Sequence, residues 1–184
     1  GYQRYQGYHE QFPVILVVHV ILVILLGMDK ILTVEQLINI IKRLKRDGKR
    51  IVLVGGIFDL IHRGHIEFLE AAEREGDILV VLLESDKKTK EIKSKNRPIN
   101  VQEDRAFVLS RFVMVDFVIP LPYCKEDKDY EKLVKMIQPD IIAVTKNDML
   151  RNLKKRYAKL VHGKLVEVMS RIKEYSTTKI EEKI

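Results

Sequence analysis

The chain has 184 residues, of which 46% are hydrophobic, and it contains one cysteine, Cys124. This length suits one domain with a single hydrophobic core, and a lone cysteine excludes a disulfide framework within the chain and fits a reducing compartment. The net charge of +7, from 33 basic and 26 acidic residues, does not by itself separate a nucleic acid, a membrane surface or a polyanionic nucleotide as the partner.

The N-terminal segment, residues 1–27, differs in character from the rest of the chain. Residues 12–26 are apolar except for His19, and a helix of that length, at about 1.5 Å per residue, falls short of a hydrocarbon core of about 30 Å. A small-x-small cleavage pattern does not follow it. We therefore expect Met28 to be the native start and residues 1–27 to come from an expression vector, with a membrane anchor or a native extension as the alternatives.

From residue 28 onward, helical and strand patterns alternate within one domain, residues 28–184. Thr33 and Gln36 have capping-box spacing, which predicts a helix over residues 33–47 ahead of a core at 50–184. Apolar runs predict buried strands at 51–54, 78–83, 116–119, 141–144 and 164–168. Further helices are expected near 66–76, 100–113, 130–137 and 149–161, the second opening with a possible capping box at Asn100. The alternation predicts a single-domain α/β fold, a Rossmann-like parallel sheet of about five strands flanked by helices.

The segment between the first strand and the next helix is the most informative one. It reads G-I-F-D-L-I-H-R-G-H over residues 56–65, which places His62 and His65 where a strand turns into a helix. The N–H groups and positive dipole end of such a helix favour a phosphate. Gly56 would let the backbone approach an anion closely, and Gly64 would keep the space between the histidines free.

Other polar segments also follow predicted strands. A basic loop covers residues 85–95, Lys146-Asn147-Asp148 follows the fourth strand, and residues 171–178 follow the fifth. Residues 176–178, Ser-Thr-Thr, would begin a short helix and offer hydroxyl and N–H groups to phosphate. Because ligands of parallel sheets bind beyond the carboxyl ends of the strands, we expect these segments to form one active site.

Residues 56–65 resemble the H-x-G-H signature of the cytidylyltransferase-like nucleotidyltransferases, and residues 171–180 resemble the second signature of that family, R-T-E-G-I-S-T-T. Lys173 and Glu174 depart from that second signature. The stretch 85–105 is most similar to the adenylyltransferase domain of ADP-heptose synthase. The resemblance implies transfer of AMP, or alternatively CMP, from a nucleoside triphosphate with Mg²⁺ to a sugar phosphate or similar small phosphorylated acceptor, with release of pyrophosphate.

The resemblance also implies roles for individual residues. Those implied for catalysis are His62, His65 and Lys93. Those implied for nucleotide binding are Gly56, Ile57, Phe58, Asp59, Gly64, Asp148, Arg171, Ser176, Thr177 and Thr178. Those implied for acceptor binding are Lys90, Arg105 and Lys146, with Lys90 and Lys93 on a mobile flap and a structural ion pair as the alternative for Arg105. No metal site built by the protein alone is expected, and a zinc site of the two histidines and Asp59 is the weaker alternative.

Several alternatives stay open. A glycerol-phosphate-type cytidylyltransferase or a FAD synthetase-like adenylyltransferase would use the same motifs. The helix at 149–161 has a basic face that could bind a nucleic acid, although an amphipathic surface helix explains it equally well. From the Arg97-Pro98-Ile99-Asn100 match we expect ATP rather than CTP. We also expect a cytoplasmic homodimer that binds no nucleic acid, and a membrane only if residues 12–26 are a native anchor.

Overall fold

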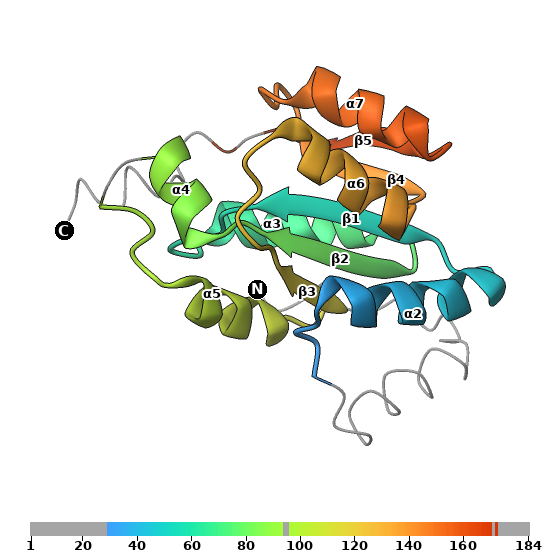
Figure 1. The fold of residues 1–184 in the computed structure, drawn as a ribbon, viewed down its shortest axis with the longest axis horizontal. Coiled ribbons are helices and arrows are strands. Elements are labelled where there is room, and N and C mark those ends of the chain that lie inside the picture. The colour runs from blue at the N-terminus through green and yellow to red at the C-terminus, as the bar shows by residue number, and fades with distance from the viewer. Residues whose placement is uncertain (1–28, 94–95, 171, 173–184) are drawn as a thin grey trace, which may run out of the picture.

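The computed structural model describes residues 29–93, 96–170 and 172. They form a five-stranded sheet in the order β3-β2-β1-β4-β5, in which every neighbouring pair is parallel (Figure 1). The predicted Rossmann-like α/β fold is therefore confirmed. The strands are β1 (Ile51–Gly56), β2 (Ile78–Leu83), β3 (Phe117–Pro120), β4 (Ile141–Thr145) and β5 (Lys164–Met169).

Helices cover both faces of the sheet, which explains why its central strands are apolar throughout. Because side chains alternate along a strand, Ile51 and Leu53 pack into one core while Val52 and Val54 pack into the other. In Figure 1, α2 and α6 lie in front of the sheet and α3 lies behind it. The helices are α2 (Val34–Arg46), α3 (Arg63–Glu73), α4 (Asp86–Ile92), α5 (Gln102–Ser110), α6 (Asp127–Ile137) and α7 (Arg151–Leu160).

Two segments differ from the sequence-based expectation. The basic loop expected at residues 85–95 contains α4, which begins where the Ser85 side chain accepts a hydrogen bond from the Lys88 N–H at 3.2 Å. The capping box expected at Asn100 does not form, and Val101 is the N-cap of α5 without a side-chain bond. The Asn100 N–H instead donates to Asp59 at 3.0 Å, because a tertiary contact competes successfully with the local cap.

The strand order places a switch point between β1 and β4. From β1 the chain builds outward to β2 and β3, and it then returns to place β4 on the other side of β1. The connections that follow β1 and β4 therefore diverge, which is where parallel sheets bind ligands.

The expectations about Met28 and the apolar segment 12–26 concern residues outside the described part of the chain, and they stay predictions. Among the residues that the structure describes, no helix combines the length and the apolar character needed to cross a membrane.

Asp116 generates a prediction about stability. Its carboxylate accepts a hydrogen bond from the Leu79 N–H at 2.7 Å, and burial raises its pKa from 3.8 to about 6. Since the folded pKa lies above the unfolded one, the stabilisation from this proton is complete below about pH 4 and is lost as the pH rises through about 6. As the pH rises from about 4 to above about 6, the unfolding free energy of wild type should therefore fall by as much as about 3 kcal/mol more than that of Asp116→Asn. Urea denaturation at both pH values measures this, and parallel losses in the two proteins would contradict it.

Candidate active site

A cleft of about 1310 Å³ opens beyond the carboxyl ends of β1 and β4. This volume exceeds what one drug-sized ligand usually occupies, so the cleft has room for two reactants. Its walls come from the end of β1, the first turn of α3, α4, the loop after β4, and α6 and α7. Among the residues lining it are Gly56, Phe58, His62, His65, Glu84, Lys88, Lys93, Tyr130, Lys146, Asp148 and Lys154.

Both histidines of the predicted motif line this cleft, and the first turn of α3 fixes their positions. His62 is the N-cap of α3, and its backbone N–H donates to Nδ1 of His65 at 3.4 Å. His65 thus occupies the position of the Glu or Gln of a capping box. Because Nδ1 accepts this bond, Nε2 is left as the hydrogen-bond donor of the His65 ring.

The two imidazole rings are stacked, with centroids 3.9 Å apart and an interplanar angle of 25°. The turn therefore holds both rings side by side, as hydrogen-bonding groups on the wall of the cleft.

The turn between β1 and α3, residues 57–61, carries backbone strain. Phe58 and Leu60 have φ values of 48° and 49°, a left-handed conformation that costs bulky residues of order 1–3 kcal/mol each. Gly56 makes room for this turn, because a Cβ there would lie 2.8 Å from the Phe58 ring. The structure thus gives Gly56 a packing role, and the expected close approach to an anion stays a prediction.

Asp59 has a structural role that the motif alone did not reveal. Its carboxylate is buried, and it accepts hydrogen bonds from the N–H groups of Ile99 (2.8 Å) and Asn100 (3.0 Å). Nε of Arg97 lies 2.8 Å from the same carboxylate. Asp59 therefore ties the turn after β1 to the segment before α5. It also lines the cleft, so the nucleotide contact that the resemblance implies stays a prediction.

Arg105 is also structural, which corrects its expected role in acceptor binding in favour of the alternative. The side chain is 1% exposed and does not line the cleft. Its guanidinium donates to Asp86 at 2.7 Å and to backbone carbonyls after β1, after β2 and before α5. These carbonyls belong to Ile57, Glu84 (2.9 Å) and Asn100 (3.0 Å). A guanidinium with this set of bonds holds the loops together.

Helical geometry decides which lysines of α4 face the cleft. Lys88 and Ile92 line it, four residues apart on one side of the helix, and Lys93 lines it at the C-cap. Lys90 is exposed and does not line the cleft, because a residue two positions from Lys88 points to the opposite side of a helix. Lys88 thus takes the place expected for Lys90, and a helix prediction for this segment would have found it.

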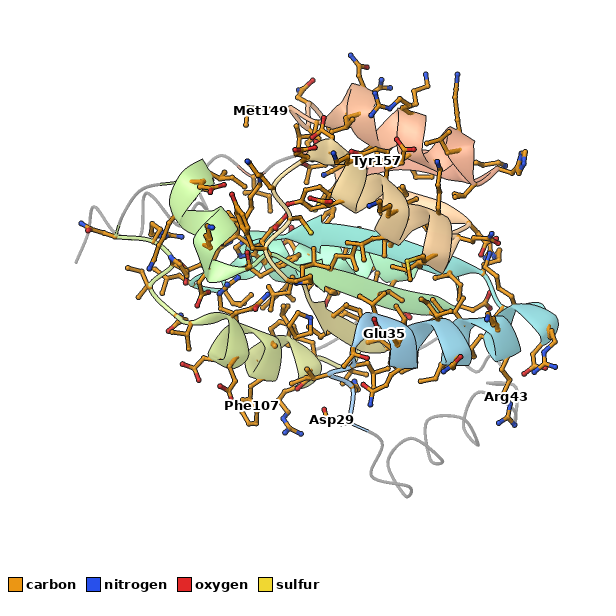
Figure 2. The ribbon with its side chains drawn as sticks, viewed as in Figure 1. Asp29, Glu35, Arg43, Phe107, Met149 and Tyr157 are labelled. Carbon is orange, nitrogen blue, oxygen red and sulfur yellow. The ribbon has the colours of Figure 1, made fainter. Side chains whose placement is uncertain are left out.

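The residues after β4 reach the cleft as expected. Asn147 adopts a φ of 61° in a turn closed by the Asp148 N–H and the Thr145 carbonyl at 3.3 Å. Asp148 accepts from the Leu150 N–H at 2.8 Å and pairs with Nζ of Lys154 at 2.9 Å. One lysine of the basic face of α7 therefore points into the cleft. Figure 2 shows Met149, which also lines the cleft, projecting from the loop before α7.

Sequence reasoning missed a half-buried pair, Glu84 and Tyr130, that also lines the cleft. The Tyr130 hydroxyl lies 3.0 Å from each carboxylate oxygen of Glu84. Burial raises the pKa of Glu84, and burial together with the neighbouring carboxylate raises the pKa of Tyr130. The position of Glu84 directly after β2 was the only sequence signal, because no motif marks either residue.

Arg171, Ser176, Thr177 and Thr178 lie outside the described residues, so their expected contacts with nucleotide stay predictions. Ser170 and Ile172, on either side of Arg171, do line the cleft. Both residues therefore place the last described part of the chain at the cleft.

Comparisons with known proteins agree with this geometry. The model of the cytidylyltransferase-like family matches residues 53–183. The bifunctional protein HldE of Sulfurimonas denitrificans is 43% identical over 108 residues, which are 59% of this chain and 22% of that protein. HldE of Campylobacter fetus subsp. fetus is 42% identical over 114 residues, 61% of this chain and 23% of that protein. The match thus spans less than a quarter of these relatives.

Solved structures show the same fold. A lipopolysaccharide core biosynthesis protein from Thermoplasma volcanium has a TM-score of 0.52 and 30% identity, covering 70% of this chain and 100% of its own. Pantoate-beta-alanine ligase from Francisella tularensis, complexed with beta-gamma ATP and beta-alanine, has a TM-score of 0.58. Its 17% identity, over 82% of this chain and 75% of its own, supports a likeness of fold alone.

The buried position of Arg105 predicts a large loss of stability in Arg105→Met. The variant leaves three carbonyls and Asp86 without their donor, and each lost buried partner costs roughly 1–3 kcal/mol. We expect the unfolding free energy to fall by about 3 kcal/mol or more, measured by urea denaturation. Arg111→Met is the matched control, because Arg111 is exposed at the end of α5 and stacks on Phe107. Similar losses in both variants would contradict the structural role.

Proposed function

The chain belongs to the cytidylyltransferase-like family, and on that premise we propose that it is a nucleotidyltransferase that transfers AMP from ATP to a sugar phosphate or similar small phosphorylated acceptor. The observation that carries the proposal is the stacked histidine pair at the start of α3, on the wall of a cleft beyond β1 and β4. The stretch 85–105 resembles an adenylyltransferase domain, which favours ATP over CTP. The neighbour named for lipopolysaccharide core biosynthesis is consistent with a sugar-derived acceptor.

The proposed reaction is a displacement at the α-phosphorus of the nucleotide. An oxygen of the acceptor phosphate forms a bond to that phosphorus, the bond to the bridging oxygen breaks, and pyrophosphate leaves with the electron pair. A phosphate oxygen is already nucleophilic at neutral pH, so no strong general base is needed. Catalysis then depends on alignment and on stabilising charge at the phosphoryl oxygens.

The residues around the cleft suit these two tasks. Nε2–H of His65 and the His62 ring supply donors held in place by the first turn of α3. The positive end of that helix favours the developing charge. Lys93 and Lys146 line the cleft with positive charge, and we assign Lys93 to the transferred phosphoryl group and Lys146 to the acceptor phosphate.

Mg²⁺ would enter the cleft as a companion of the triphosphate. Within residues 29–93, 96–170 and 172, no group of three or more metal-ligating side chains occurs. Magnesium in such sites usually keeps several waters and takes only one or two carboxylates besides substrate phosphates. Asp148, a carboxylate at the edge of the cleft, would supply that ligand, and the ion would neutralise phosphate charge.

The histidines give the first test of this function. His62→Ala and His65→Ala should each lower the turnover of pyrophosphate release by about 10²–10³-fold, as expected for a preorganised charge-stabilising donor. Release is measured with ATP and, separately, CTP in the presence of a panel of sugar phosphates. His162→Asn is the control, because His162 is exposed and Asn tolerates its φ of 57°. Near-wild-type turnover in both alanine variants would refute the mechanism.

The second family motif gives another test. If Arg171 and Thr177 hold the triphosphate, Arg171→Ala and Thr177→Ala should weaken ATP binding by about tenfold, the loss of one or two charge-assisted hydrogen bonds. Isothermal titration calorimetry measures the affinity directly. An unchanged ATP affinity in both variants would remove these residues from the nucleotide site.

A further inference from the structure

A second hollow, of about 340 Å³, lies between α7 and β5, and we call it the β5 groove. It is lined by Arg151, Lys155, Ala158 and Lys159 of α7 and by residues 163–166. β5 is one edge of the sheet, and α7 lies along it (Figure 1). None of the described residues lines both this groove and the active-site cleft, so the groove is a separate surface on a different side of α7.

The groove follows the edge of β5 rather than one of its faces. Leu165 packs into the core that contains residues of α7, and Val166 packs into the core on the other face, yet both line the groove. The Lys164 N–H donates to the Asp140 carbonyl at 2.8 Å, on the side of β4. Because successive residues of a strand direct their backbone groups to opposite edges, the N–H and C=O of Leu165 point away from β4. Within the described part of the chain, no strand pairs with this outer edge.

Positive charge surrounds this edge. Lys155, Lys159 and Lys164 line the groove and are exposed. Among the ion pairs of residues 29–93, 96–170 and 172, one involves a residue of the groove, and it joins Arg151 to Glu167 of β5. The three lysines therefore have no carboxylate partner in that part of the chain, and their charges are available to a ligand.

The open edge and the lysines together fit an extended acidic peptide. The backbone groups of a strand edge can pair with those of another strand, and lysines favour a strand that carries carboxylates. A second copy of this chain would bring the same lysines to the edge, and like charges opposite each other destabilise pairing. A phosphodiester backbone has no donor for the Leu165 carbonyl, and the groove offers Ala158 and Val166 where single-stranded nucleic acids usually stack on aromatic side chains.

We propose that the β5 groove binds an extended acidic segment of another protein, which adds a strand to the sheet beside β5. Main-chain hydrogen bonds to the edge give the affinity, and Lys155, Lys159 and Lys164 select the acidic side chains. Such a partner would leave the active-site cleft open, because the cleft has no residue in common with the groove. The proposal goes beyond the proposed function and does not depend on it.

Synthetic peptides test this interaction with the full chain. The main probe is a fluorescently labelled nonapeptide in which Glu alternates with Val or Thr, a length sufficient for a strand. The same peptide with N-methyl groups on alternate residues lacks the donors for an edge, a Lys–Val nonapeptide reverses the charge, and a labelled oligothymidylate represents a nucleic acid. Fluorescence anisotropy should show saturable binding of the acidic peptide, about tenfold or more tighter than that of each other probe.

Two double variants with the same change in net charge separate the groove from the general charge of the protein. Lys155→Glu/Lys159→Glu should weaken binding of the acidic peptide by about tenfold or more, because attraction is replaced by repulsion. Lys42→Glu/Lys132→Glu is the matched control, since both residues are exposed on helices, α2 and α6, and neither lines the groove. This control should keep the wild-type affinity. Urea denaturation measures whether both variants are as stable as wild type, and the N-methylated peptide tests the edge on wild type alone.

Several outcomes would overturn the proposal. They are an acidic peptide that does not bind saturably, an N-methylated peptide that binds as tightly, tighter binding of the Lys–Val peptide or the oligothymidylate, and equal losses of affinity in the two double variants. Self-association of wild type that is lost in Lys155→Glu/Lys159→Glu, measured by analytical ultracentrifugation, would assign the groove to a second copy instead. Pyrophosphate release is measured separately, and its absence would refute the proposed function without affecting the groove.

Discussion

The buried guanidinium of Arg105 is the interaction on which the rest of this cleft depends. Three backbone segments meet at it, and their carbonyls all accept hydrogen bonds from this one side chain. Planar geometry and five donors allow one arginine to satisfy them together with Asp86. Lysine could not do this, since its ammonium group is a point charge with three donors. The arrangement of the loops around the cleft is therefore set by a side chain that does not line the cleft.

These hydrogen bonds of Arg105 matter because the backbone of the turn after β1 is strained. Two bulky residues within that turn adopt left-handed backbone conformations, and such conformations persist only where the surroundings over-determine them. Arg105 holds one end of the turn through the Ile57 carbonyl, and Asp59 holds its middle through the segment before α5. The same turn places His62 at the N-cap of α3. Positions fixed before substrate arrives are what electrostatic catalysis requires.

Two groups of residues line the cleft, one inside the sequence motif and one outside it. In the reaction proposed above, the motif at residues 56–65 serves the phosphoryl chemistry, whichever acceptor is bound. Glu84, Lys88 and Tyr130 also line the cleft, but they belong to no motif and come from three separate segments. Folds and motifs constrain chemistry more tightly than specificity, so the acceptor of this protein is better sought in that second group than in the signatures.

The sequence by itself determined the layers of the fold and the position of the histidines, because periodicity and motif spacing are local properties. It predicted β2 to the residue and the other strands closely. Only the tertiary structure decided the rest. Asp59 and Arg105 hold together the loops around the cleft, Lys88 lines the cleft whereas Lys90 does not, and Glu84 contacts Tyr130 across 46 positions of the chain. Local sequence patterns do not predict such contacts. The contacts depend on how separate elements pack and on which buried polar groups then need hydrogen-bond partners.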